Sequence, residues 1–154
     1  MRIAIGTDHA GYALKERLKQ ELTRLGHEIE DLGTYAPEPP VDYPDFCFPV
    51  GERVASGRAE RGIVLGGSGI GECIAANKVS GVRAALIHSD ETARLARQHN
   101  DSNVLALGGR TVNHEDAVRW LGIWLSTPFE GGRHIARIQK ISAYEHRLVE
   151  FRRS

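Results

Sequence analysis

The stretch Gly62-Ile-Val-Leu-Gly-Gly-Ser-Gly-Ile-Gly-Glu72 decides the fold of this chain. Its short apolar run, Ile63 to Leu65, is bounded by turn residues, which is typical of a strand buried on both faces. Glycines then interrupt the run, and a helical pattern begins at Glu72. The stretch therefore predicts a strand, a glycine loop and a helix N-terminus in immediate succession.

The same junction predicts an anion site, because glycines let the backbone approach a ligand and a helix N-terminus presents unpaired N–H groups. Three common motifs do not fit. A P-loop needs Lys and Ser or Thr where Glu72 and Cys73 stand, and the dinucleotide fingerprint needs Gly at position 72. The nucleophile elbow needs Gly where Ile70 stands. A carboxylate beside N–H donors suits a base that removes a proton while the donors stabilise an oxyanion.

Simpler roles remain open for two residues of this stretch. Glu72 also fits as an acid in the first helical turn, where the helix dipole favours negative charge. Ser68 also fits as an ordinary N-cap. The pattern within the stretch does not choose between these roles and ligand contact.

Length and composition bound the class of protein. With 154 residues, the chain predicts a single domain spanning residues 1–154 with a sizeable core. Its 20 basic and 20 acidic residues cancel, so bulk charge recruits neither nucleic acid nor a membrane. We find no N-terminal signal and no apolar run near the about 20 residues of a membrane span. We expect a cytoplasmic protein in which Cys47 and Cys73 are reduced and partly buried.

Strand and helix patterns alternate along the chain. Strands are predicted near residues 3–5, 28–32, 63–65, 82–87 and 104–107, and helices near 14–25, 46–54, 72–76, 90–99, 116–125 and 133–151. The alternation predicts an α/β, Rossmann-like fold with three layers, α/β/α, a five-stranded parallel sheet and an extended C-terminal helix. Ligands of such sheets bind beyond the carboxyl ends of the strands.

Polar residues follow two other predicted strands at that edge. Asp8 and His9 come directly after the first strand, and Arg110 follows Gly108-Gly109 after the fifth. We therefore expect these side chains beside the glycine loop. Asp8 has an open alternative as a helix cap, and Arg110 as a solvated surface residue.

His99 ends the inward stripe of its helix. That helix leaves the carboxyl edge near Asp90 and rises about 1.5 Å per residue, so His99 should reach the opposite edge of the sheet, away from Glu72. Either His99 is a cation at a helix C-terminus with Asn100 in a left-handed cap, or both residues complete the site of a symmetric partner.

Two arginines of the last helix are a further candidate pair. Arg133 and Arg137 lie one turn apart, with His134 beside them. Neighbouring guanidinium groups of this kind can hold a phosphate by charge-assisted hydrogen bonds. The alternative for each arginine is simple solvation.

Segments along nearly the whole chain resemble the type B ribose-5-phosphate isomerases, a family that includes galactose-6-phosphate isomerase subunits. The matching segments are Thr7-Asp8-His9-Ala10-Gly11, Asp42-Tyr43-Pro44, Gly66-Gly67-Ser68-Gly69-Ile70-Gly71, Ile74-Ala75-Ala76-Asn77-Lys78, Arg97-Gln98-His99-Asn100-Asp101 and Gly131-Gly132-Arg133-His134. The resemblance implies an aldose–ketose isomerase that acts on ribose 5-phosphate through a cis-enediolate, without a metal or other cofactor. It also implies a homodimer, or a tetramer, with shared active sites.

The family divides over its catalytic base. One branch has a cysteine at the position of Gly66, and the other a glutamate at the position of Glu72. This chain is similar to the glutamate branch, and Cys73 matches neither pattern, so we interpret Cys73 as a packing residue.

The resemblance implies roles for the candidate residues. Glu72 would move the proton between C1 and C2, Ser68 would contact the oxyanion, His99 would open the furanose ring and Asp8 would receive the hydroxyl proton. The implied substrate-binding set is Asp8, His9, Tyr43, Gly67, Ser68, Gly69, Ile70, Gly71, Asn100, Arg110, Arg133 and Arg137. Within that set, His9 and the three arginines would bind phosphate, Gly67 to Gly71 would form the anion hole, Asn100 would bind a sugar oxygen and Tyr43 would line the pocket.

Two alternatives remain open. The first is an isomerase of another sugar phosphate, such as a tetrose 4-phosphate, allose 6-phosphate or galactose 6-phosphate, because pocket length decides the substrate. The second is a sugar-phosphate-binding module without catalysis, against which Glu72 and His99 argue.

Overall fold

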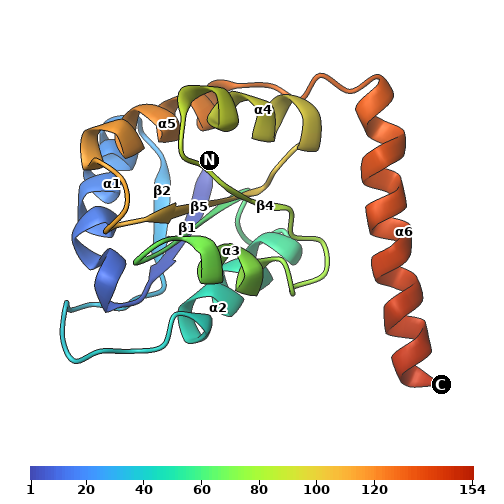
Figure 1. Ribbon diagram of the computed structural model, residues 1–154, viewed down its shortest axis with the longest axis horizontal. Helices are drawn as coiled ribbons and strands as arrows, with labels where there is room; N and C mark the ends of the chain where they lie inside the picture. Colours follow the sequence, from blue (N-terminus) through green and yellow to red (C-terminus); the bar gives the residue numbers. More distant parts are fainter.

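A five-stranded parallel sheet forms the centre of the computed structural model, which describes residues 1–154 (Figure 1). Its strands lie in the order β2-β1-β3-β5-β4, and each neighbouring pair is parallel. The strands are β1 (Arg2–Thr7), β2 (Glu28–Asp31), β3 (Arg61–Gly66), β4 (Ala84–Leu86) and β5 (Val104–Gly108). The predicted strands are all present, although β4 is shorter than expected.

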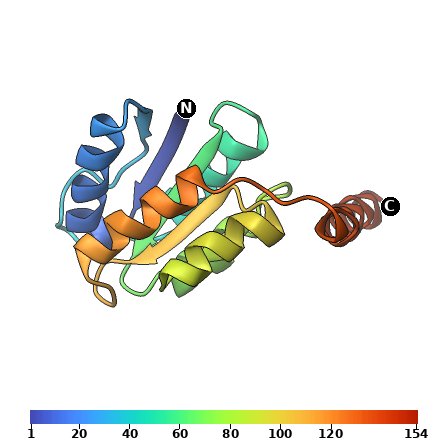
Figure 2. The same ribbon diagram turned by 90° about the horizontal axis from the view of Figure 1, so that it is seen from above.

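Helices cover both faces of the sheet (Figure 2). They are the short 3-10 helix η1 (His9–Gly11), α1 (Tyr12–Arg24), α2 (Pro44–Ala55), α3 (Ile70–Ala76), α4 (Asp90–Asn100), α5 (His114–Ser126) and α6 (Arg133–Arg153). One buried cluster joins the sheet to α1, α4 and α5, and a second joins it to α2 and α3. The predicted Rossmann-like α/β/α sandwich is confirmed.

Alternation along the strands explains why two cores form. Ile63 and Leu65 of β3 belong to the cluster with α1, α4 and α5, whereas Val64 between them belongs to the cluster with α2 and α3. Successive side chains of a strand point to opposite faces, so a strand that is apolar throughout needs cover on both sides. The apolar run that predicted a buried strand thus also sets the three layers.

The boundary of α4 differs from the prediction. Asp101, with φ of 44°, takes the left-handed conformation that one of the two alternatives assigned to Asn100, which is instead the last helical residue. Aspartate tolerates this conformation better than most residues. The Asp101 carboxylate also forms an ion pair with Arg97 of the last turn at 2.8 Å.

The last helix, α6, stands apart from the three layers in both views (Figures 1 and 2). Its predicted length is confirmed, but much of its apolar side is exposed, including Ile135, Ile141 and Phe151. Near its middle, the Glu145 carboxylate accepts a hydrogen bond from the Gly81 N–H at 3.1 Å. Neither α6 nor any other helix is both long and apolar enough to span a membrane.

Candidate active site

Three loops meet at the carboxyl edge of the sheet. The chain leaves β1 toward β2 on one side and leaves β3 toward β4 on the other, so the adjacent ends of β1 and β3 mark a topological switch point, where ligands of such sheets bind. The loop after β5 joins them, because the Gly109 N–H donates to Gly66 O at 2.7 Å and the Arg110 N–H to Gly67 O at 3.0 Å.

The glycine loop presents free N–H donors. The N–H groups of Gly67 and Ser68 have no acceptor within the protein, whereas the Ile70 N–H donates to Ser68 Oγ at 3.2 Å. Gly69 holds the N-cap position with φ of 80°, a conformation that favours glycine. Ser68 lies one residue before the N-cap, so the ordinary N-cap role is not observed. Its Oγ accepts from the first helical N–H, and its own backbone N–H stays free for a ligand.

Glu72 lies in the first turn of α3, buried beneath this loop. It is 3% exposed, and its Oε2 is buried with no hydrogen-bond partner. Its carboxyl group occupies the space over Gly66 that any larger side chain there would fill. A buried, unpartnered carboxylate oxygen is costly, and such groups concentrate at functional sites. The placement favours ligand contact over a plain dipole role.

The pKa of Glu72 is raised above its usual value. Burial is the main cause, because it penalises the ionised form. Its own backbone N–H opposes this effect, the Asp8 carboxylate adds to it, and the Gly69 N–H opposes it more weakly. A raised pKa brings the carboxylate closer to the strength that a general base needs near neutral pH.

Asp8 and His9 follow β1, as predicted, and each makes hydrogen bonds through one side-chain atom within the chain. Asp8 is 7% exposed, and its Oδ1 accepts from the N–H groups of Ala10 at 2.9 Å and Gly11 at 3.3 Å. Asp8 is therefore the N-cap of η1. His9 Nδ1 lies 3.1 Å from the Val41 N–H group, which leaves Nε2 for a ligand.

An open cleft adjoins the glycine loop. It has a volume of about 810 Å³ and is lined by His9, Pro37, Glu38, Pro39, Pro40 and Arg110. The Arg110 side chain passes close to Gly67, is exposed and makes no ion pair. The Tyr43 ring covers Gly71 so closely that a side chain at position 71 would overlap it. These contacts bring Tyr43, Arg110 and His9 to one edge of the sheet, but Tyr43, which was expected to line the pocket, is not among the residues that line this cleft.

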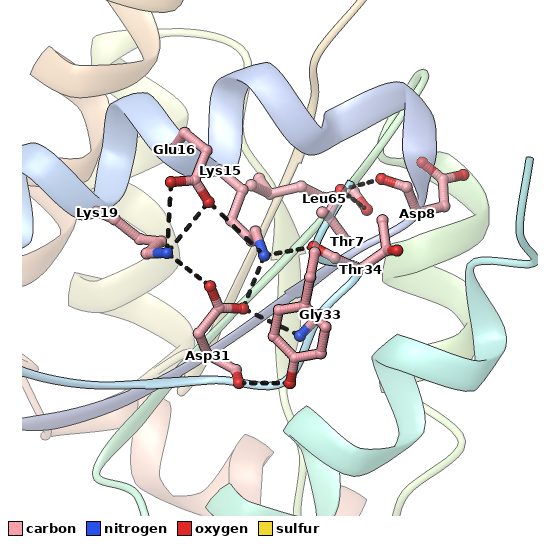
Figure 3. Close-up of polar contacts among 10 residues, drawn as sticks. Thr7, Asp8, Lys15, Glu16, Lys19, Asp31, Gly33, Thr34 and Leu65 are labelled. Carbon is pink, nitrogen blue, oxygen red and sulfur yellow. Dashed lines mark hydrogen bonds and ion pairs between the residues drawn. The ribbon is translucent and has the colours of Figure 1, made fainter. Parts of the chain in front are cut away.

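A buried lysine supports this edge from beneath (Figure 3). Lys15 of α1 is fully buried, and its Nζ donates to Asp31 Oδ1 at 2.7 Å and to Thr34 O at 2.6 Å. The turn that it holds pairs with the end of β1, because the Thr34 N–H donates to Thr7 O and the Thr7 N–H to Gly33 O, both at 2.7 Å. Thr7 directly precedes Asp8, so the network fixes the start of the Asp8 loop.

We expect Lys15→Met to lower the free energy of unfolding by about 2–3 kcal/mol, because it leaves Thr34 O without this donor and Asp31 without its buried partner. The expected loss is smaller than the loss caused by breaking an isolated buried ion pair, because Lys19 Nζ also donates to Asp31, at 2.7 Å. Urea denaturation measures the effect. Lys19→Met is the matched control and should cost about 1 kcal/mol or less, because Lys19 is partly exposed. Equal losses in the two variants would contradict this account of the network.

Four predicted site residues lie elsewhere. His99 and Asn100 end α4 near the amino ends of β4 and β5, where Asn100 O accepts from Arg83 Nε at 3.0 Å. This is the opposite edge of the sheet from the glycine loop, as the helical rise predicts. Arg133 and Arg137 are exposed at the start of α6 and make no ion pair. One chain therefore supplies two separate groups of candidate residues.

Lys15 and Glu130 were missing from the predicted site and its surroundings. Lys15 shares its helix face with the buried Leu18 and Leu22, so a lysine at helical spacing within an apolar stripe was the available signal. Glu130 lies within reach of His99 and His134, with oxygen-to-Nε2 distances of 3.9 and 3.7 Å. No sequence pattern could have predicted that Glu130 lies near the two histidines, because the path of the loop between α5 and α6 determines its position.

Comparisons with known proteins agree with this arrangement. The ribose/galactose isomerase family profile matches residues 3–141. Ribose-5-phosphate isomerase B of Escherichia coli is 43% identical over 146 residues, which cover 95% of this chain and 97% of that protein.

Solved structures agree as well. Ribose-5-phosphate isomerase B of Clostridium thermocellum superposes with a TM-score of 0.94 at 47% identity, covering 96% of this chain and 99% of that one. The Mycoplasma genitalium enzyme with bound ribulose 5-phosphate gives 0.91 at 42% identity, covering 94% and 96%.

Proposed function

We propose that this chain, which belongs to the ribose/galactose isomerase family, interconverts ribose 5-phosphate and ribulose 5-phosphate through a cis-enediolate. Membership of this family identifies the chain as an aldose–ketose isomerase. The substrate and the mechanism are our proposal. The observation that carries the proposal is the buried Glu72 carboxylate, whose Oε2 lacks a partner beside the free N–H groups of Gly67 and Ser68. A base next to oxyanion donors is the arrangement that enolisation requires.

Glu72 is the proposed base of the isomerisation. It takes the proton from C2 of the open-chain aldose and becomes a carboxylic acid, while the electron pair of the C–H bond forms the enediolate double bond. It then returns the proton to C1, which gives the ketose. The negative charge develops on the oxygen of C1, and the glycine loop, Gly67 to Gly71, stabilises it with backbone donors. Asp8 takes the proton of the C2 hydroxyl through its Oδ2, because Oδ1 serves the η1 cap, and delivers it to the oxygen of C1, which becomes the C1 hydroxyl of the ketose.

The acid that opens the ring is proposed to come from a second copy of the chain. His99 protonates the ring oxygen, and Asn100 binds a sugar oxygen. Both end α4, at the opposite edge of the sheet from Glu72 in the same chain, and α6 exposes an apolar side. A symmetric homodimer, or a tetramer built from it, would bring one chain's His99 to the other chain's Glu72.

Phosphate binding is proposed for His9 and three unpaired arginines. Arg110 and His9 share the open cleft, and Arg133 and Arg137 come from the second chain. Unpaired guanidinium groups are free to form charge-assisted hydrogen bonds with a phosphate. No cofactor takes part in this mechanism. A single domain over residues 1–154 and a cytoplasmic location stay predictions.

A turnover comparison tests the substrate. The purified protein is assayed with ribose 5-phosphate, allose 6-phosphate, galactose 6-phosphate and erythrose 4-phosphate, and we expect the highest kcat/KM with ribose 5-phosphate. A higher value with another sugar would transfer the assignment to that sugar, because the cleft length sets the substrate. Binding of all four without turnover would instead support a sugar-phosphate-binding module.

His99→Asn should separate ring opening from proton transfer. Ribose 5-phosphate is mainly a closed furanose, whereas ribulose 5-phosphate has its O5 phosphorylated and cannot close that ring. We expect turnover of ribose 5-phosphate to fall about 10²-fold, which is a typical rate reduction when a general acid is removed. Exchange of the C1 proton of ribulose 5-phosphate with deuterated solvent, followed by NMR, should stay near the wild-type rate.

The comparison variant for this experiment is Glu72→Gln, which should lose both reactions because the base serves each of them. Equal losses of turnover and exchange in His99→Asn would refute the ring-opening role. His146→Gln, which changes an exposed histidine of α6, is the matched control and should alter neither reaction.

A further inference from the structure

Two histidines and a glutamate converge away from the glycine loop. His99 ends α4, His134 lies in the first turn of α6, and Glu130 belongs to the loop between α5 and α6. The two imidazole rings stack with centroids 4.3 Å apart and planes 15° apart. Glu130 Oε2 lies 3.9 Å from His99 Nε2 and 3.7 Å from His134 Nε2. All three ligand-type atoms lie within 4.8 Å of one another.

The backbone holds these residues in place while the side chains stay adjustable. The Glu130 N–H donates to Gln98 O at 3.1 Å, which ties the loop to the residue before His99. The His134 N–H donates to Gly131 O at 3.1 Å and fixes the first turn of α6. The Glu130 carboxylate is 48% exposed and accepts no hydrogen bond, so it is free to move toward the imidazoles.

Imidazole nitrogens and a carboxylate oxygen are the ligands that Zn²⁺ prefers outside thiolate sites. Bonds of about 2.0–2.1 Å in a tetrahedral site require ligand atoms about 3.3–3.4 Å apart. The two histidine-to-glutamate distances exceed this spacing by only about 0.5 Å, whereas all three atoms lie only within 4.8 Å of one another and the two rings are nearly parallel. One imidazole must therefore turn out of the stack, and the partly exposed His99 has room to do so. His99 is 35% exposed, which leaves one side open for a water as fourth ligand.

A metal ion competes with protons for the two imidazoles, because a histidine ligand must be neutral. Arg133 and Arg137 lie on the same helix as His134 and make no ion pair. The two arginines also oppose a bound cation, so we expect affinity below that of a dedicated structural zinc site.

We propose that His99, Glu130 and His134 form an inhibitory site for Zn²⁺ or a similar transition-metal ion. The ion binds His99 Nε2, and it thereby withdraws the group that opens the sugar ring. The inhibition, but not the metal binding, rests on the proposed function of His99. The site would let the isomerase respond to free zinc without using a metal in catalysis.

Metal binding is measured first, without reference to activity. The full chain, treated with a chelator and dialysed, is titrated with Zn²⁺ by calorimetry and with Co²⁺ by visible absorption, whose intensity reports four-coordination. We expect one site per chain, and Glu130→Gln and His134→Gln should each weaken it at least about tenfold. The matched controls Glu150→Gln and His146→Gln, on the exposed part of α6, should leave the affinity unchanged. Absence of a one-per-chain site, or the same affinity in all variants, would overturn the proposal.

Inhibition is measured second, with each variant compared with its own zinc-free rate. Zn²⁺ should inhibit ribose 5-phosphate turnover with the midpoint found for binding, and a chelator should reverse it. Glu130→Gln should move that midpoint to at least about tenfold higher zinc. Deuterium exchange into ribulose 5-phosphate should resist zinc. Binding without inhibition would overturn the inhibitory role, whereas a fully active His99→Asn variant would overturn the proposed ring opening and leave the metal site standing.

Discussion

Glu72→Gln is expected to reduce isomerisation of ribose 5-phosphate at least about 10³-fold, because the carboxamide cannot accept the C2 proton. The sugar phosphate should bind about as tightly as before, since the N–H donors and arginines are unchanged. Steady-state kinetics and a direct binding measurement separate the two effects. Glu72→Asp, which keeps a carboxylate but shortens its reach, should retain intermediate activity. Near-normal turnover of Glu72→Gln would remove Glu72 from the mechanism.

The same variant should be at least as stable as the wild type at neutral pH. Burial raises the pKa of Glu72, so the folded state holds this proton more tightly than the unfolded state does. The stabilising contribution is therefore complete at acidic pH and is lost as pH rises through the raised pKa. Glutamine carries no charge to desolvate and escapes this loss. Thermal unfolding at several pH values checks the sign, and a lower midpoint for Glu72→Gln above neutral pH would contradict it.

Gly66→Ala is expected to lower turnover about 10²-fold while leaving the fold intact. The three atoms nearest to a Cβ at this position all belong to the Glu72 side chain. Because the carboxyl group is the flexible end of that side chain, it should swing out of its place instead of straining the sheet. Displacing a base by about 1 Å is enough for a loss of this size.

The control for this substitution is Gly122→Ala. Gly122 lies in α5, and a Cβ there meets no atom within 4 Å, so the change should leave turnover unaltered and add slightly to stability. Chemical denaturation should show a change within about 1 kcal/mol for Gly66→Ala. Unfolding of that variant, or full activity in a folded one, would contradict the overlap. By the same overlap, a side chain at position 66, such as a cysteine, would displace an inward glutamate at position 72.

The fold could be predicted from the sequence because the patterns that indicate its strands and helices are local. Each apolar run and each helical stripe reports its own burial, and Gly26, with φ of 80°, follows the predicted end of the first helix. The exposure of the apolar side of α6 could not be predicted from the sequence, since its isoleucines have the same spacing as those of a helix buried within its own chain. Lys15 is a related case, because only the tertiary positions of Asp31 and Thr34 make its burial tolerable.

Half of the site could be predicted because parallel strands carry their following loops to one edge. Asp8, Glu72 and Arg110 lie there for that reason alone. Two features depend on side-chain rotamers, which a motif does not specify. They are the buried Glu72 Oε2 without a hydrogen-bond partner and the hydrogen bond from the Ile70 N–H to Ser68 Oγ. The stack of His99 on His134 depends on the path of the loop that enters α6, which no periodicity describes.

The proline-rich segment that lines the open cleft, residues 37–40, has an evolutionary consequence. None of its side chains belongs to either buried core, and His9 ties the backbone that follows it to the site through Val41. Insertions or replacements there would lengthen or shorten the cleft without disturbing Glu72 or its donors. Under the proposed function, the size of the sugar accepted can therefore change through one surface segment, while Glu72 and its donors, in a separate and buried part of the molecule, stay unchanged.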